Sequence, residues 1–189
     1  MNNIAIFASG SGTNAQAIIE YFLSKNEMPI KLILSNKADA FVLERAKNFN
    51  IRTIIFNKEQ FYKTDEIIEI LQTEKIRLIV LAGFLWLMPG NILKPFKNRI
   101  INIHPALLPK YGGKGMYGMK VHEAVVANRD SESGITVHYV NEEYDQGEII
   151  FQASCSIDKN DTAENVALKI HELEYAHFPK IVEKVAMQI

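Results

Sequence analysis

The first hundred residues alternate short apolar runs with helical patterns, and this alternation restricts the fold more than any other feature. The runs are rich in Ile, Val and Leu and are continuous rather than alternating, as in strands buried on both faces. They occupy residues 4–8, 30–34, 51–56, 78–82 and 100–103. Apolar side chains recur at helical spacing between them, over residues 14–24, 38–49 and 63–74. Strands that alternate with helices predict an α/β fold with a doubly wound, mostly parallel sheet.

The remainder of the chain predicts an antiparallel addition to that sheet. After a helix over residues 120–128, two strands over residues 134–140 and 147–157 flank a short polar connection. A short connection favours antiparallel pairing, because parallel strands need a long crossover. With 189 residues and 48% hydrophobic content, the chain is expected to form a single domain over residues 1–189.

A long final helix is expected after the second of these strands. Asp161 or Thr162 supplies its N-cap, and Glu164 places a negative charge in its first turn. Pro179 lacks a backbone N–H and is expected to kink or interrupt this helix near Phe178.

Composition and charge restrict the class of protein. The 21 basic and 22 acidic residues leave a net charge of −1, which gives no overall field to attract nucleic acid or an anionic membrane. No apolar run approaches the roughly 20 residues that span a bilayer, and the N-terminus lacks a basic segment and a cleavage site. A single cysteine, Cys155, excludes an internal disulfide and is expected to be a small buried apolar residue. These features predict a cytoplasmic protein.

A glycine-rich turn follows the first predicted strand and opens the first helix. Gly10 and Gly12 allow close approach of a phosphate, and Ser11, Thr13 and Asn14 add side-chain donors at a helix N-terminus. Neither the triphosphate-loop ending nor the third glycine of the dinucleotide pattern is present. A single phosphomonoester is therefore the predicted ligand, and the alternative interpretation is a tight turn without a ligand.

Two polar side chains stand in the apolar run that forms the fifth predicted strand. Asn102 and His104 are two apart and share one face, at the carboxyl end where doubly wound sheets bind ligands. The Asn amide and a protonated His offer two donors to a carbonyl oxygen as it becomes an oxyanion. The alternative is that His104, beside Pro105, is a structural hydrogen-bonding residue.

Asp145 lies in the predicted turn between the two antiparallel strands. A carboxylate near His104 would raise the affinity of the histidine for its proton and could accept a proton from an attacking amine. Ordinary turn chemistry is the alternative for Asp145. Glu142 and Glu143 are expected to be solvated surface residues.

These motifs together resemble the phosphoribosylglycinamide formyltransferases of purine synthesis. The resemblance covers essentially the whole chain, in order, through "GSGTN", "NIHPALLPKYGG" and "TVHYVNEEYDQGEII". It implies transfer of the formyl group of 10-formyltetrahydrofolate to the amino group of glycinamide ribonucleotide. Asn102, His104 and Asp145 fall on the catalytic positions of that family. No metal, no permanently bound cofactor and no covalent intermediate is implied.

The resemblance also implies the substrate-binding residues. The ribonucleotide phosphate is assigned to Gly12, Thr13 and Asn14, and its glycinamide and ribose to Gly83 and Glu174. Residues 1–100 would form the Rossmann-like, phosphate-binding half, and residues 101–189 the catalytic and folate-binding half. The folate site is assigned to Leu85, Trp86, Leu87, Met88 and Asn102. Core packing remains an alternative for about half of the run 84–88, since alternate side chains face inward.

The sequence departs from the family pattern at two places. Residues 112–125 are longer and richer in glycine than in many members, which makes residues 112–118 a candidate mobile lid and leaves the role of His122 open. Trp86 stands where an arginine is often found, which could alter folate affinity. His138 is either a group supporting the site or an ordinary sheet residue, and the bond before Pro109 is a candidate cis peptide.

Four other functions stay open at the level of sequence. A methionyl-tRNA formyltransferase or a formyltetrahydrofolate deformylase would be expected to carry a further domain, for which this chain has no room. A sugar-nucleotide formyltransferase would bring further elements for the nucleotide base. A noncatalytic nucleotide-binding module would bind a ligand without turnover. The partners expected are small molecules, with no nucleic acid or membrane, and the oligomeric state is a monomer or a homodimer.

Overall fold

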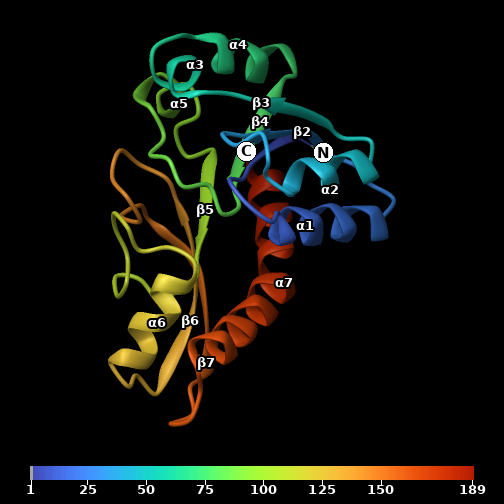
Figure 1. Cartoon of the computed structure of the whole chain (residues 1–189). Helices are drawn as coiled ribbons and strands as arrows, with labels where there is room; N and C mark the ends of the chain where they lie inside the picture. The colour runs from blue at the N-terminus through green and yellow to red at the C-terminus, as the bar shows by residue number, and fades with distance from the viewer. Residues whose placement is uncertain (1) are drawn as a thin grey trace.

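The computed structural model describes residues 2–189 and shows one mixed sheet with helices on both faces (Figure 1). Within this range the sheet has seven strands in the order β3-β2-β1-β4-β5-β6-β7. The strands are β1 (Asn3–Phe7), β2 (Ile30–Ser35), β3 (Arg52–Ile55), β4 (Ile76–Leu81), β5 (Ile100–His104), β6 (Glu132–Tyr139) and β7 (Ile149–Ser156). The helices are α1 (Thr13–Ser24), α2 (Val42–Asn48), α3 (Lys58–Tyr62), α4 (Glu66–Thr73), α5 (Gly90–Leu93), α6 (Met119–Ala127) and α7 (Ala163–Gln188).

The predicted mixture of parallel and antiparallel strands is confirmed. Strands β1 to β5 pair in parallel, whereas β6 pairs antiparallel with both β5 and β7. From β1 the chain builds outward to β2 and β3, and it then returns to place β4 on the other side of β1. The strand order therefore reverses between β1 and β4, and such a switch point opens a crevice at the carboxyl ends of the strands.

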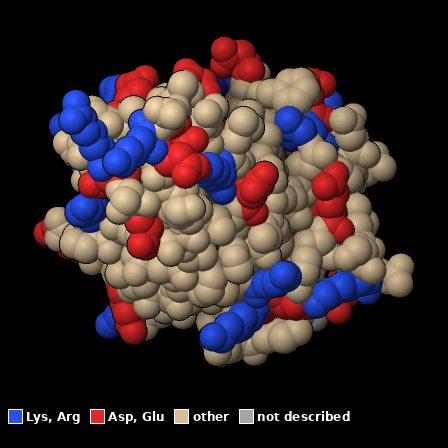
Figure 2. Space-filling model, turned by 90° about the horizontal axis from the view of Figure 1, so that it is seen from below, with Lys and Arg blue, Asp and Glu red and all other residues tan. Residues whose placement is uncertain are grey.

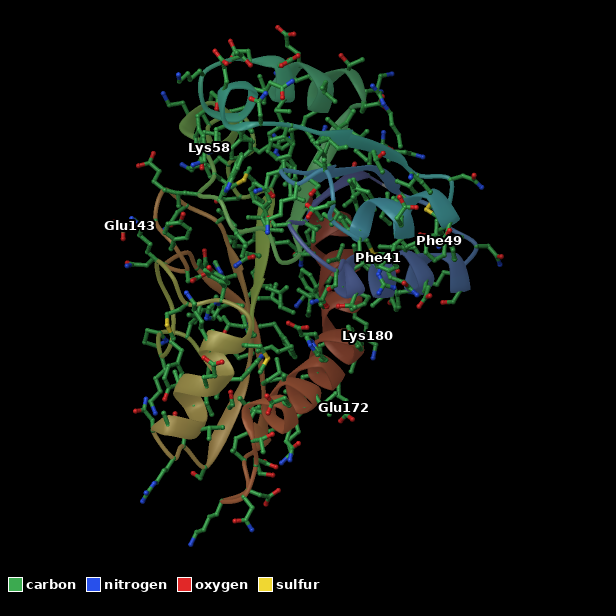
Figure 3. All side chains as sticks on the ribbon, in the orientation of Figure 1. Phe41, Phe49, Lys58, Glu143, Glu172 and Lys180 are labelled. Carbon is green, nitrogen blue, oxygen red and sulfur yellow. The ribbon has the colours of Figure 1, made fainter. Side chains whose placement is uncertain are left out.

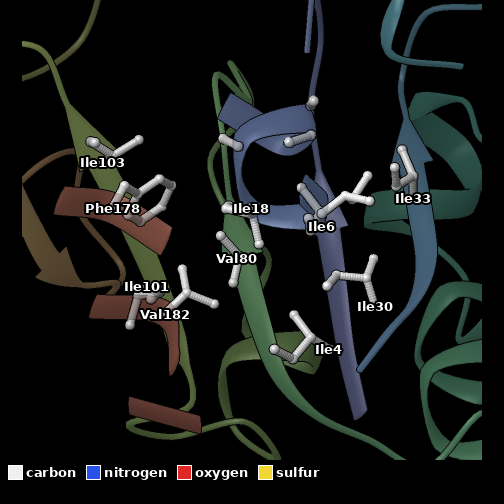
Figure 4. Close-up of a cluster of buried hydrophobic side chains, with 14 of the residues drawn as sticks. Ile4, Ile6, Ile18, Ile30, Ile33, Val80, Ile101, Ile103, Phe178 and Val182 are labelled. Carbon is white, nitrogen blue, oxygen red and sulfur yellow. The ribbon is translucent and has the colours of Figure 1, made fainter. Parts of the chain in front are cut away.

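Two hydrophobic clusters lie on opposite faces of the sheet. Ile4 and Ile6 of β1 belong to the cluster that includes residues of α1, α2 and α7, whereas Phe7 belongs to the cluster that includes residues of α3, α4 and α5. Figure 4 shows the first cluster, with Phe178 and Val182 of α7 beside the strands. Each fully buried Ile or Phe side chain contributes about 1.5–3 kcal/mol, so burial on both faces explains the continuous apolar runs.

The helices on the second face differ from their prediction. One helix over residues 63–74 was expected, but α3 ends at Tyr62 and α4 begins at Glu66. Asn57 starts α3 with a capping box, because its side chain accepts a hydrogen bond from the Gln60 N–H and the Gln60 side chain accepts one from the Asn57 N–H. Helix α2 begins four residues later than expected, at Val42, and the four-residue α5 was not predicted.

Helix α7 begins as predicted but is not interrupted. Thr162 is the N-cap and accepts a hydrogen bond from the Asn165 N–H at 3.3 Å. The helix continues through Pro179 to Gln188, and Figure 1 shows its ribbon bending without a break. Pro179 is buried in the helix face that contacts the sheet, so packing outweighs the lost backbone hydrogen bond. Lys180 is exposed, and Figure 3 shows it on the outer side of α7.

The surface and the single cysteine complete the description. Figure 2 shows Lys and Arg interspersed with Asp and Glu on the face that it presents. None of the helices in residues 2–189 combines the length and the apolar character needed to cross a bilayer. The expectation that Cys155 is buried is wrong, because it is only half-buried. It lies on β7, the edge strand, where nothing pairs with the outer side of the strand within the described range.

Candidate active site

A cavity of about 610 Å³ opens at the carboxyl ends of the central strands, where the strand order reverses. It brings together the glycine-rich first turn, the turn after β4, the end of β5, the loop before α6, the turn between β6 and β7, and α7. Asn102, His104 and Asp145 all line it, together with the predicted substrate-binding residues Gly12, Thr13, Asn14, Gly83, Leu85 and Glu174. The topology therefore collects the predicted site residues from segments that are distant in sequence.

The two glycines of the first turn have different roles. Gly12 has φ of +74°, and a Cβ atom there would lie 2.4 Å from Val42 Cγ2. The Val42 N–H also donates a hydrogen bond to the Gly10 carbonyl at 3.1 Å, which fixes the start of α2 against the turn. A Cβ at Gly10 would meet nothing within 4 Å. Gly12 is thus required by backbone conformation and by packing against α2, while only Gly10 leaves open space beside the cavity.

Helix α7 sets the orientation of Asn14. The Asn14 Nδ2 donates to Glu174 Oε2 at 2.9 Å, and Glu174 also contacts His171 Nδ1 at 3.0 Å. Glu174 is 5% exposed and Asn14 Oδ1 is buried without a hydrogen-bond partner among the described residues. The hydrogen bond to Glu174 raises the pKa of His171, although burial opposes it. One of the two hydrogens of the Asn14 side-chain amide, which the sequence assigned to a ligand, is therefore directed to Glu174.

The turn after β4 is joined to the first turn through Ser9. The Ser9 N–H donates to the Gly83 carbonyl at 3.0 Å, and the Leu85 N–H donates to Ser9 Oγ at 3.2 Å. Gly83 has φ of +73°, a conformation that glycine adopts without steric cost. Gly83 and Leu85 consequently line the cavity between the first turn and Asn102.

The rest of the predicted folate run lines a smaller neighbouring cavity of about 50 Å³, which shares Asn102 and Asp145 with the large one. Trp86 packs against Tyr62 and other aromatic residues, and the Lys58 ammonium lies 5.9 Å from its ring centroid. Met88 is 3% exposed and belongs to the hydrophobic core. Residues 84–88 therefore combine core packing with cavity lining, but not in strict alternation, because Phe84 and Met88 are buried and the three residues between them are half-buried.

His138 lies directly opposite Asn102 in the antiparallel pair of β5 and β6. Its Nδ1 donates to the Tyr139 carbonyl at 2.8 Å, and its Nε2 lies 3.1 Å from Asn102 Nδ2 and 3.5 Å from Asp145 Oδ1. The same Asn102 nitrogen is 3.4 Å from Asp145 Oδ1. His138 therefore orients the Asn102 amide and is not an ordinary sheet residue.

His104 is held between a backbone carbonyl and a carboxylate. Its Nε2 is 2.7 Å from the Tyr111 carbonyl oxygen, and its Nδ1 is 3.5 Å from Asp145 Oδ2. A carbonyl can only accept, so Nε2 carries a hydrogen and Nδ1 faces Asp145. Burial lowers the pKa of His104 below 6.5, although Asp145 and the Tyr111 carbonyl act in the opposite direction. Nδ1 is therefore the nitrogen whose protonation Asp145 favours, while burial opposes the charge.

Asp145 occupies a strained turn and stays ionised. Its backbone has φ of +57°, and its Oδ2 accepts a hydrogen bond from the Gly113 N–H at 3.0 Å. Burial raises the pKa of Asp145, but His138, His104 and this N–H together outweigh burial and hold the pKa below its usual value. Glu142 and Glu143 are exposed as expected, and Figure 3 shows Glu143 extending away from the fold.

Several cavity residues were not predicted. His171 and Lys37 line the cavity, and the spacing of His171 three residues before Glu174 on a helix was the available signal for His171. Met116 and Tyr117 also line it, within residues 112–118, whose role as a mobile lid stays a prediction. His122 also lines it, is 3% exposed, and has an Nδ1 without a hydrogen-bond partner in the described part of the chain. The peptide bond between Leu108 and Pro109 is cis, which confirms the expectation for Pro109.

Comparison with known proteins places this chain in a family. Residues 2–182 match the formyl transferase family. A phosphoribosylglycinamide formyltransferase of Haemophilus influenzae is 39% identical, with 97% of this chain and 86% of that protein aligned. A crystal structure of glycinamide ribonucleotide transformylase 1 from Symbiobacterium toebii has a TM-score of 0.88 and 31% identity, and the match covers 100% of this chain and 89% of that one.

The chloroplastic phosphoribosylglycinamide formyltransferase of Arabidopsis thaliana is 37% identical over 95% of this chain. The match spans only 63% of the plant protein, less than two thirds of its length. Sequence and fold nevertheless agree along nearly the whole of the present chain. The chain therefore belongs to the formyl transferase family.

Proposed function

We propose that this protein transfers the formyl group of 10-formyltetrahydrofolate to the amino group of N1-(5-phosphoribosyl)glycinamide, a step of purine biosynthesis. The observation that carries the proposal is the convergence of Asn102, His104 and Asp145 in one cavity. An amide donor, a buried imidazole and an ionised carboxylate are the groups that formyl transfer to an amine requires. The names of the relatives from Haemophilus influenzae and Symbiobacterium toebii support the same reaction.

The two substrates are assigned to opposite ends of the site. The phosphate binds at Gly12, Thr13 and Asn14, where the first N–H groups of α1 have no partner within the helix. Glu174 and Gly83 contact the ribose and glycinamide portions. The pterin of the folate binds along residues 85–88 and at Asn102, beside the aromatic cluster around Trp86. The amine and the formyl carbon then meet at the end of β5.

The amine attacks the formyl carbon directly. The Asn102 amide hydrogen that points toward Asp145 makes a long contact of 3.4 Å, and this hydrogen turns to the formyl oxygen as negative charge develops. The growing oxyanion raises the proton affinity of His104 Nδ1, which takes up the proton that the attacking amine loses, and Asp145 stabilises the resulting imidazolium from 3.5 Å. The proton then passes to the folate nitrogen as the bond between the formyl carbon and that nitrogen breaks. Asp145 also assists movement of the proton from the amine to the departing folate nitrogen. The reaction needs no covalent intermediate and no permanently bound cofactor.

The two halves of the chain are assigned to the two ends of the site. Residues 1–100 form the phosphate-binding half, and residues 101–189 the catalytic and folate-binding half. The proposed location is the cytoplasm, since a single cysteine suits a reducing compartment, and the proposed oligomeric state is a monomer or a homodimer.

The test follows the absorbance of 10-formyltetrahydrofolate with the purified protein, first with and then without the ribonucleotide. Rapid loss of the formyl group only when the ribonucleotide is present supports the proposal. Equal rates in both cases would identify a hydrolase. Absence of reaction in both would point to another acceptor or to a binding protein.

A further inference from the structure

One short segment of backbone contacts both ionisable groups of the catalytic site. The Tyr111 carbonyl accepts a hydrogen bond from His104 Nε2 at 2.7 Å, and the Gly113 N–H donates one to Asp145 Oδ2 at 3.0 Å. These two backbone groups are only two residues apart. The position of the segment 111–113 therefore determines how His104 and Asp145 face each other.

This segment is held from outside the cavity by the Tyr111 side chain. The Tyr111 hydroxyl donates to Asp130 Oδ2 at 2.7 Å and accepts from Asn128 Nδ2 at 2.7 Å. Asn128 is the C-cap of α6, and Asp130 lies two residues beyond it. Lys110 Nζ also contacts the same carboxylate and lies 3.4 Å from Asp130 Oδ1. The hydroxyl thus fastens the segment to the C-terminal end of α6, in a cluster that is separate from the substrate cavity.

The backbone of Tyr111 needs such an attachment. Its φ of +55° is in the left-handed region, which costs a residue other than glycine roughly 1–2 kcal/mol. The ring is half-buried and packs against the hydrophobic cluster on the α7 face of the sheet. Tyr111 is absent from the residues that line the cavity, whereas Gly113 lines it. Its side chain consequently acts on the site through the backbone and not through contact with a substrate.

The carbonyl of Tyr111 decides which nitrogen of His104 is available. While Nε2 donates to this carbonyl, Nδ1 faces Asp145, from which it is 3.5 Å away. Displacement of the carbonyl would release the ring to rotate or to move its hydrogen to Nδ1. Either change would remove the free nitrogen from the place where formyl transfer needs it.

We propose that Tyr111 is a positioning residue for formyl transfer, which acts by fastening through Asp130 and Asn128 the carbonyl that fixes the orientation and tautomer of His104. The inference rests on the proposed function, since it assigns a role in the same reaction. It predicts that the Tyr111 hydroxyl affects turnover and the pH dependence of turnover without affecting the binding of either substrate.

Kinetics of Tyr111→Phe provide the first test. A kcat lower by about 10-fold is expected, with KM unchanged for both substrates, because small displacements of a catalytic group cost about this much or more. The Tyr111 carbonyl raises the pKa of His104, so a weakened bond should also shift the acid limb of the kcat/KM profile to lower pH. An unchanged kcat and an unchanged profile would overturn the proposal.

A matched control separates this effect from general destabilisation. Tyr21 also donates its hydroxyl to a carboxylate, Glu183 Oε2 at 2.6 Å, but between α1 and α7 and away from the cavity. Tyr21→Phe should change stability while leaving kcat and the pH profile as in the unmodified protein. If Tyr21→Phe reproduced the kinetic loss of Tyr111→Phe, a purely structural effect would explain both and the proposal would be wrong.

A double-mutant cycle tests the connection to Asp130. Asp130→Asn keeps an oxygen that can accept the Tyr111 hydroxyl and should retain most of the activity, whereas Asp130→Ala should lose as much as Tyr111→Phe. The double variant Tyr111→Phe/Asp130→Ala should lose no more than either single variant. Additive losses would show that the two residues act separately and would contradict the proposed connection.

A spectroscopic measurement makes the inference independent of the reaction. The ¹⁵N chemical shifts of the His104 ring report its tautomer in the unmodified protein and in Tyr111→Phe. A hydrogen on Nε2 that is lost or redistributed in the variant supports the proposal, and identical shifts overturn it. If the protein failed to transfer formyl groups at all, the proposed function would fail while this measurement would still decide the role of Tyr111.

Discussion

The two ends of the cavity are built in different ways. The first turn is a local structure, in which strand, turn and helix follow one another within residues 3–24 and the available donors are backbone N–H groups. The end of β5 instead assembles side chains from separate segments: Asn102 and His104 from β5, His138 from β6, and Asp145 from the following turn. Binding is thus assigned to backbone, and chemistry to side chains held by long-range contacts.

This difference implies different responses to substitution. A site made of backbone depends on conformation, so its glycines should show their importance mainly in folding stability. A site made of side chains depends on atoms that contact the reacting groups, so its residues should show their importance mainly in rate. Four predictions test this difference between the backbone end and the side-chain end of the cavity.

The largest effect is expected from Asn102→Ala. Loss of one oxyanion donor should lower kcat by about 10²–10³, with little change in the unfolding transition because Asn102 is only half-buried. Steady-state kinetics and urea denaturation measure the two quantities. The control is Glu142→Ala, an exposed position three residues before Asp145, which should keep full activity. Near-normal turnover of Asn102→Ala would defeat the assignment of the oxyanion site.

The glycines of the first turn provide the second prediction. Gly12→Ala should destabilise the protein by about 1–3 kcal/mol, because the new methyl group would lie 2.4 Å from Val42 Cγ2 at a φ of +74°. Gly10→Ala is the matched comparison and should leave stability nearly unchanged, since its Cβ meets nothing within 4 Å. Chemical denaturation of both variants measures the difference. Equal stabilities would show that α2 does not constrain the turn.

The third prediction concerns pH and the buried histidines. Burial lowers the folded-state pKa of His104 and of His122, so the unfolded chain binds more protons and stability falls as the pH decreases below about 6.5. His171 has the opposite sign, because its raised pKa contributes stability at low pH that is lost as the pH rises through its folded-state value. Each histidine contributes at most about 1.4 kcal/mol per pH unit.

Denaturation of His122→Gln and of the unmodified protein between pH 7.5 and 5.5 isolates one of these contributions. The variant should lose less stability over this range, because the neutral Gln side chain does not titrate. A steeper loss in the variant would mean that the pKa of His122 is raised rather than lowered in the folded protein.

The smallest effect is expected at the α7 edge of the cavity. Glu174→Gln removes the carboxylate that contacts His171 and Asn14, so the pKa of His171 should fall toward its ordinary value. Glu172→Gln changes an exposed carboxylate on the same helix and should leave the titration of His171 in place. Proton NMR titration of the His171 ring measures its pKa in the two variants. If the His171 titration were unchanged in Glu174→Gln, the contact with Glu174 would not be the cause of the raised pKa of His171.

The sequence predicted the local features of the fold and site well. Buried parallel strands can be predicted from the sequence because each needs a continuous apolar run. The polar residues Asn102 and His104 are conspicuous within such a run. The single helix predicted over residues 63–74, in place of α3 and α4, and the predicted interruption of α7 at Pro179 were wrong. In the first case a short-range hydrogen-bonding pattern was overlooked, and in the second tertiary packing outweighed the preference of proline.

The parts that escaped prediction depend on pairing between distant segments. The position of His138 opposite Asn102 follows from the register of β5 and β6, which no single segment specifies. The hydrogen bond between Asn14 and Glu174 joins residues 160 positions apart. The role of Gly12 was read as phosphate access, whereas its contact with Val42 arises from the placement of α2. These features require the three-dimensional arrangement.

The placement of α7 has a consequence for how the protein is made. The helix contacts α1, α6, β6 and β7, and it supplies Phe178 and Val182 to a cluster that also contains Ile4 and Ile6. A ribosome releases α7 after every strand of the sheet, so the part of this apolar face that α1 and α2 do not cover stays exposed until α7 is made. The order of synthesis therefore makes the packing of α7 the last step in covering this face.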